Sequence, residues 1–180
     1  TGGGLVGGVL GLSGGINYST AEKIIGSGIG NTAALAGLAS VQRGFIQSVS
    51  GNNTFAGDIE LSGNGGSRIG TQDGSQLTLT GAITQGSGIS TASILFRAGS
   101  TAGDFVTLSN AGNSFGGNSA IFTGASGGYA GVRLGVSDAL PTNLTISSFS
   151  GTGAGTALDL NGKNQSLNGL INGATLNIVN

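Results

Sequence analysis

The stretch 51–61 reads G-N-N-T-F-A-G-D-I-E-L, and a similar stretch, G-N-S-F-G-G-N-S-A-I, occupies 112–121. With a constant spacing of 60 residues, Asn53, Phe55, Gly57 and Leu61 correspond to Asn113, Phe115, Gly117 and Ile121. A recurrence without gaps indicates stacked structural units. Asn beside Gly favours a turn, and the alternation of polar and apolar residues in 58–61 is typical of a half-buried strand. Short turns that alternate with short strands predict a β-solenoid.

Further strand-like segments follow the first stretch at short intervals. They are four to six residues long, are bounded by Gly, Asn or Ser, and lie at 58–61, 76–80, 93–96, 105–108, 120–123, 131–134, 144–147, 157–160 and 175–179. This pattern fits either a parallel β-helix or an antiparallel sandwich or barrel. The 60-residue recurrence favours the first, since it can hold about three coils of roughly 20 residues. We therefore predict an all-β solenoid of about eight to nine coils.

Composition excludes several classes of function. The 180 residues include 39 Gly, only 7% are charged, the net charge is −1, and Cys and His are absent. A nucleic-acid-binding protein needs a basic surface, which this chain does not offer. Without Cys and His, thiol and imidazole catalysis and the usual transition-metal ligands are excluded, so we expect no cofactor and no metal. No apolar run approaches the length of about 20 residues that a membrane helix requires.

Five stretches resemble the autotransporter-associated β-strand repeat of large bacterial surface proteins. They cover much of 48–180 and comprise 51–61, 112–117, 73–83 (D-G-S-Q-L-T-L-T-G-A-I), 132–146 (V-R-L-G-V-S-D-A-L-P-T-N-L-T-I) and 157–170 (A-L-D-L-N-G-K-N-Q-S-L-N-G-L). The resemblance implies a right-handed parallel β-helix and export to the outer surface of a bacterial cell or beyond it. It supplies no catalytic motif to transfer.

The candidate residues within the coils have structural roles. Asp58 and Glu60 share one face of a strand, a spacing that could serve calcium binding or glycosidase chemistry, but alternation places them outward as surface charges. The charged residues are scattered singly, so we predict that the protein is not an enzyme. Asn residues at the turns are expected to hydrogen-bond from coil to coil. The core stack is predicted to contain Phe55, Phe115, Leu61 and Ile121.

The two ends of the chain indicate how the solenoid would be used. Residues 1–18 are predicted to form a Gly-rich apolar segment that could be donated to a neighbour as a strand, and 19–180 to form the solenoid. Both ends carry apolar residues that would expose an unpaired edge, with assembly residues at Leu5, Val6, Val9, Leu10, Leu12, Leu176, Ile178 and Val179.

These ends predict self-association into a homopolymer. The expected function is therefore an extracellular structural subunit that forms a fibre or matrix by end-to-end association. The alternative is an adhesin passenger or stalk that binds carbohydrate or a host surface through a lateral face.

Overall fold

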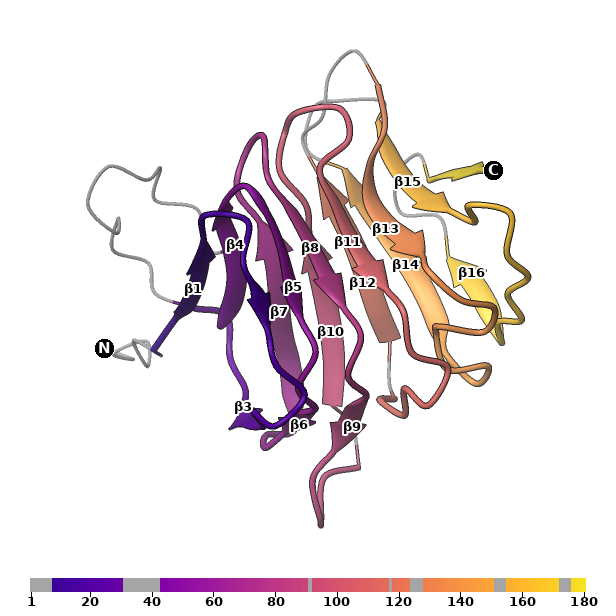
Figure 1. The fold of residues 1–180 in the computed structure, drawn as a ribbon. Helices are drawn as coiled ribbons and strands as arrows, with labels where there is room; N and C mark the ends of the chain where they lie inside the picture. The colour runs from indigo at the N-terminus through magenta and orange to yellow at the C-terminus, as the bar shows by residue number, and fades with distance from the viewer. Residues whose placement is uncertain are drawn as a thin grey trace, which may run out of the picture.

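Parallel strands wind through the whole of the structure, which is a computed structural model (Figure 1). It describes residues 8–30, 43–90, 92–116, 118–123, 128–150, 155–171 and 176–180. No helix occurs among these residues, and every strand pair in them is parallel. The chain is therefore an all-β solenoid, as the sequence predicts.

Two long sheets and one short sheet form the sides of the solenoid. Sheet A has seven strands in the order β1 (Leu10–Ser13), β4 (Ile46–Ser50), β7 (Gly65–Thr71), β10 (Ala92–Arg97), β12 (Asn118–Thr123), β14 (Thr145–Ser150) and β16 (Gly169–Ile171). Sheet B also has seven, in the order β2 (Asn17–Tyr18), β5 (Asn52–Phe55), β8 (Gln76–Leu79), β11 (Phe105–Leu108), β13 (Ala130–Leu134), β15 (Thr156–Asp159) and β17 (Asn177–Val179). Sheet C contains β3 (Ile24–Gly26), β6 (Ile59–Leu61) and β9 (Ile83–Gln85).

The strand positions follow from local alternation. All nine expected segments overlap a strand of the structure, and β10 alternates strictly between buried and partly exposed residues. The strand β7 was not expected, because its sequence G-G-S-R-I-G-T has too few apolar residues to show a two-residue period. Its backbone pairs with β4 and β10 on either side, so its neighbours hold it extended.

The core is built from side chains stacked in register from coil to coil. On sheet A, Ile46 aligns with Ile69, Ile69 with Phe96, and Phe96 with Ile121, and all four are fully buried. On sheet B, the aligned and buried series is Phe55, Leu79, Leu108 and Leu134. Each such side chain contributes about 1.5–3 kcal/mol by leaving water.

The 60-residue recurrence is not the structural repeat. Phe55 aligns with Leu79, and Leu79 with Leu108, so these two coils are 24 and 29 residues long. Phe55 belongs to sheet B, whereas the residue before Phe115 bridges to Thr84 beside sheet C. The two stretches therefore share a local design, a buried Asn two residues before a buried Phe, which is used on two different sides of the solenoid.

The four predicted core residues are buried but do not form one stack. Phe55 lies in sheet B, Leu61 in sheet C and Ile121 in sheet A, each with an exposed fraction of at most 1%. Phe115 packs edge-on against Phe96, with their ring centroids 6.0 Å apart. The stack divides among the sides because the coil lengths do not add up to the recurrence.

Glycine permits two close approaches between coils at the corner after sheet B. A Cβ atom on Gly57 would overlap the carbonyl oxygen of Glu22 in the preceding coil, and one on Gly81 would overlap the carbonyl oxygen of Gly57. Gly57, which interrupts the apolar alternation in the sequence, is therefore a site of backbone contact between coils.

The predicted number of coils and the predicted segment boundary are not seen in the described residues. Sheets A and B hold seven strands each, and eight to nine coils are not confirmed. Residues 8–18, expected to precede the solenoid, contribute β1 and β2, which pair with β4 and β5 of the same chain. The solenoid thus already includes this part of the N-terminal segment.

Candidate functional site

Four places on the solenoid depart from regular coil-on-coil stacking: its two ends, a charged corner between sheets A and B, and a depression beside β9. The ends are described first. Figure 1 places β1 at one end and β16 at the other. The end strands β1 and β2 pair only with β4 and β5, and the end strands β16 and β17 pair only with β14 and β15. Within the described chain, each end therefore presents one free edge of sheet A and one of sheet B.

The C-terminal end is apolar. Leu170, Ile171 and Ile178 are 55%, 54% and 47% exposed, and together with Leu176 they line a recess of about 200 Å³. Large apolar side chains that are exposed together and beside a free edge mark a contact surface. Of the residues predicted for assembly, Ile178 is exposed here, while Leu176 and Val179 are half-buried.

The N-terminal end is also apolar, although its residues divide between surface and core. Leu10, Ile16 and Ile25 are 40%, 49% and 62% exposed. Val9 is half-buried. Leu12 is fully buried in the core, so the prediction that it contacts a second molecule is wrong. The reason is its register: Leu12 aligns with the buried Ser48 and faces inward. Leu5 and Val6 lie outside the described residues.

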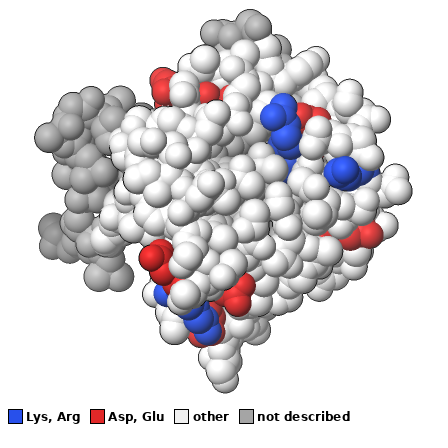
Figure 2. Space-filling model, viewed as in Figure 1, with Lys and Arg blue, Asp and Glu red and all other residues white. Residues whose placement is uncertain are grey.

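Charge is sparse around these ends. Figure 2 shows one face of the molecule with its Lys, Arg, Asp and Glu side chains at scattered positions and broad uncharged areas between them. Residues 8–18 and 164–180 carry no charged side chain. Charged residues are a usual device against edge-to-edge association, and neither stretch uses it.

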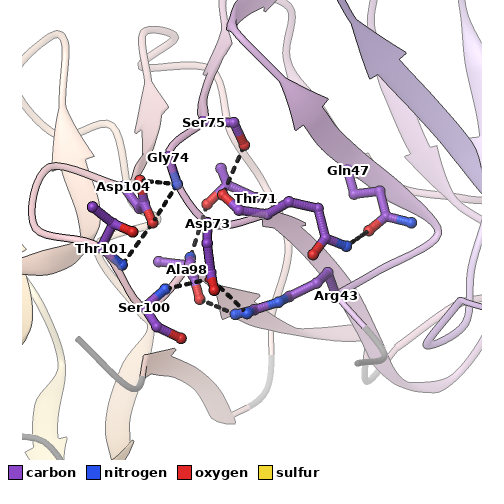
Figure 3. Close-up of polar contacts among 12 residues, drawn as sticks. Arg43, Gln47, Thr71, Asp73, Gly74, Ser75, Ala98, Ser100, Thr101 and Asp104 are labelled. Carbon is purple, nitrogen blue, oxygen red and sulfur yellow. Dashed lines mark hydrogen bonds and ion pairs between the residues drawn. The ribbon is translucent and has the colours of Figure 1, made fainter. Parts of the chain in front are cut away.

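The charged corner lies where sheet A passes into sheet B (Figure 3). Arg43 is 5% exposed, and its side chain donates from Nη1 to the carbonyl oxygen of Ala98 and from Nη2 to Oδ1 of Asp73 at 2.9 Å. Asp104 is 2% exposed, and its carboxylate accepts hydrogen bonds from the backbone N–H groups of Gly74 and Thr101.

Burial is the main influence on the ionisation of this corner. It raises the pKa of Asp104 above its ordinary value, although the Thr101 and Gly74 N–H groups oppose the shift. It lowers the pKa of Arg43, while Asp73 and Asp104 act in the opposite direction. Each charged group is held by backbone atoms of other coils, so this corner fastens coils together.

The predicted surface carboxylates lie in sheet C and beside it. Oδ1 of Asp58 accepts from the Ala82 N–H at 2.9 Å, and Glu60 forms an ion pair with Lys23 at 2.8 Å. The hydrogen bond and charge of Glu60 raise the pKa of Lys23. Both carboxylates therefore join neighbouring coils.

A depression of about 290 Å³ lies beside the end of β9. In the described residues, sheet C stops at this strand, and the same side of the solenoid continues as the loops 109–116 and 135–144. The depression is lined by Gln85, Ala111, Asn113, Ser114, Phe115, Gly116, Asp138, Leu140, Pro141, Thr142 and Asn143. Sequence reasoning missed it, because its walls come from three separate coils.

Side-chain amides hold the loops around the depression. Oδ1 of Asn113 accepts from the Ile83 N–H, and its Nδ2 donates to the carbonyl oxygen of Ala139, both at 2.7 Å. Oε1 of Gln165 accepts from the Leu140 N–H, and Nε2 of Gln165 donates to the Leu140 carbonyl oxygen, both at 2.9 Å. These bonds join coils where the strand ladder is absent, and those of Asn113 are the coil-to-coil contacts expected of Asn at the turns.

The comparisons with known proteins assign no relative. No family model, curated protein or solved structure matches the chain. The described residues contain no cluster of three or more acidic, His or Cys side chains that could hold a metal ion. They also contain no helix long and apolar enough to cross a membrane.

Proposed function

We propose that this protein is a structural subunit, a right-handed β-solenoid that associates end to end with further copies of itself. The observation that carries the proposal is that, in the described residues, the same two sheets are open at both ends. Sheet A ends on β1 and β16, and sheet B on β2 and β17. A second copy in the same orientation can therefore extend both sheets at once, with β1 following β16 as β16 follows β14.

The apolar side chains support a second copy as the partner. The recess formed by Leu170, Ile171, Leu176 and Ile178 is built largely from the end strands β16 and β17, and Leu10 and Ile16 are exposed on the first coil. Contact of two such surfaces removes apolar area from water and pairs free backbone groups. Because the contact repeats without closing on itself, its product is a filament.

The place where such a filament would act is an expectation from the sequence. The resemblance to autotransporter-associated repeats implies the outer surface of a bacterial cell or its surroundings, and the proposal is an extracellular fibre or matrix subunit without catalytic activity. The alternative, carbohydrate or surface binding through a lateral face, is favoured by the depression beside β9.

The test compares charge placed at an end with charge placed elsewhere. The variants are Leu170→Lys and Ile178→Lys, and the control is Tyr129→Lys, because Tyr129 is 45% exposed and lies between β12 and β13, away from both ends. Sedimentation velocity and electron microscopy over a range of concentrations should show filaments for the unaltered chain and the control, and monomers for both end variants.

Raising the salt concentration distinguishes association through apolar side chains and strand edges from association through charged groups. Residues 8–18 and 164–180, which include the end strands of sheets A and B, lack charged side chains, so filaments should persist in high salt, where exposed ion pairs are screened. An unaltered chain that stays monomeric at high concentration, or end variants that assemble as readily as the control, would refute the proposal.

A further inference from the structure

The depression beside β9 has the chemical character of a small binding site. Its deeper part contains the buried side chains of Phe115, Leu140 and Pro141. Its outer part contains exposed Ser114, Asp138, Thr142 and Asn143. A site with apolar area at the base and hydrogen-bonding groups around it suits a ligand that is itself apolar on one side and polar at its edges.

Gln85, which lines the depression, carries a buried polar atom without a hydrogen-bond partner. Nε2 of Gln85 is buried and makes no hydrogen bond, while the side chain lies against Gly116, about 3.5 Å from where a Cβ atom would stand. A buried amide donor without an acceptor is unfavourable, and buried polar groups in folded proteins nearly always have a partner. Protein atoms cover this donor, so an acceptor on a ligand would reach it after the Gln85 side chain turns toward the depression.

The remaining polar groups of the wall are already oriented. Asn113 is held at both ends of its amide by Ile83 and Ala139. Asp138 accepts the Ser166 N–H on Oδ1 at 2.9 Å. These contacts fix the walls of the site without using the side chains of Thr142 and Asn143, for which no hydrogen bond to the protein is seen in the described chain.

Charge and size restrict the ligand. Among the described residues that line the depression, Asp138 is the only ionisable one, so an anion would meet a carboxylate and no compensating cation there. A volume of about 290 Å³ corresponds to roughly ten water molecules of about 30 Å³ each, which is room for a single small molecule.

We propose that this depression binds one unit of a neutral carbohydrate. A sugar ring supplies hydroxyl oxygens as acceptors for Gln85 and hydroxyl donors for Asp138 and Asn143, and its C–H face can lie on Leu140 and Pro141. The site is on the side of the solenoid and does not depend on end-to-end association, so the two proposals can fail separately. The depression would let each protein subunit bind one sugar unit of a neutral polysaccharide.

The experiment uses the whole chain with defined sugars. Saturation-transfer difference NMR, which tolerates large assemblies, and titration calorimetry are applied with methyl glucoside, methyl galactoside and N-acetylglucosamine, and separately with glucuronate and with calcium chloride. We expect saturable binding of at least one neutral sugar, with weaker or no binding of glucuronate and calcium.

Two variants and one control connect binding to the depression. Gln85→Leu keeps the side-chain volume but removes the free donor, and it should weaken binding about tenfold. Asn143→Ala removes an exposed group of the lining and should weaken binding several-fold without affecting folding. Asn52→Ala changes an exposed Asn on sheet B, away from the depression, and should bind as the unaltered chain does.

Each outcome either supports or overturns the proposed sugar site. Neutral-sugar binding that both variants weaken supports the site. No saturation by any neutral sugar at tens of millimolar, preference for glucuronate, or binding of calcium alone would overturn it. Equal binding by the two variants and the control would also overturn it, because the sugar would then lie elsewhere.

Discussion

Asn53 provides the sharpest test of how one coil is fastened to the next. Its side chain is 1% exposed and accepts hydrogen bonds from the backbone N–H groups of Gly15 and Ile16 at 3.1 and 3.0 Å. It also donates through Nδ2 to Leu12, Ser48 and Ser50. One side chain thereby fixes the turn between β1 and β2 onto the second coil.

Replacing Asn53 with Ala leaves the two N–H groups without partners. Each partly buried orphan group costs about 1–2 kcal/mol, so the first coil should lose about 2–4 kcal/mol of local stability. In a solenoid each coil contacts only its neighbours, so we expect the loss to appear as opening of β1 and β2 before the other coils unfold.

Native-state hydrogen exchange measures this opening directly. Protection of the amides in residues 8–18 should fall by roughly 30-fold or more, while protection in β11 and β13 stays unchanged. Asn52→Ala is the matched control, because Asn52 is the exposed neighbour of Asn53. If Asn53→Ala leaves exchange at Gly15 and Ile16 as slow as in the control, Asn53 does not fasten the coil and the reasoning is wrong.

Three further predictions concern the core, a backbone contact and pH. Phe115→Ala should lower the free energy of unfolding by about 3–5 kcal/mol in a denaturant titration, because it empties a buried site against Phe96, and unchanged stability would contradict this packing. Gly81→Ala should lower the thermal midpoint because its Cβ would overlap the Gly57 carbonyl oxygen, whereas Gly66→Ala, whose Cβ has room, should not; equal midpoints would contradict the close approach. The raised pKa of Asp104 means that the folded state holds the proton of this carboxyl more tightly than the unfolded state does. The contribution of Asp104 to the free energy of unfolding should therefore decline as pH rises through its folded-state pKa. Asp104→Asn should lack that decline in pH-dependent unfolding, and identical pH profiles for the two proteins would disprove it.

Local sequence patterns were enough to predict nine of the seventeen strands in the described residues. The two-residue alternation in segments such as 76–80 and 105–108 depends only on neighbouring residues, and both segments form strands. Where glycine removes the alternation, as in β7, the strand could not be foreseen, because its extended backbone depends on pairing with β4 and β10. The all-β parallel class is confirmed, and the coil count is not.

The sites required information that local patterns do not carry. The recurrence of Asn53 and Phe55 at Asn113 and Phe115 predicted equivalent positions, yet the two pairs lie on different sides because the coils between them differ in length. The depression likewise has no signal in the sequence, since Gln85, Asn113 and Asn143 meet only after sheet C has ended.

The amino-acid sequence by itself therefore determined the kind of backbone, its short strands and its low charge. Those properties follow from residues a few positions apart. Only the tertiary structure decided which side chains stack, which edges stay open and where a cavity forms. Arg43 and Ala98 illustrate the reason: they are 55 residues apart and meet through the register of successive coils. Register depends on packing and hydrogen bonds summed over many coils, and no short stretch encodes that sum.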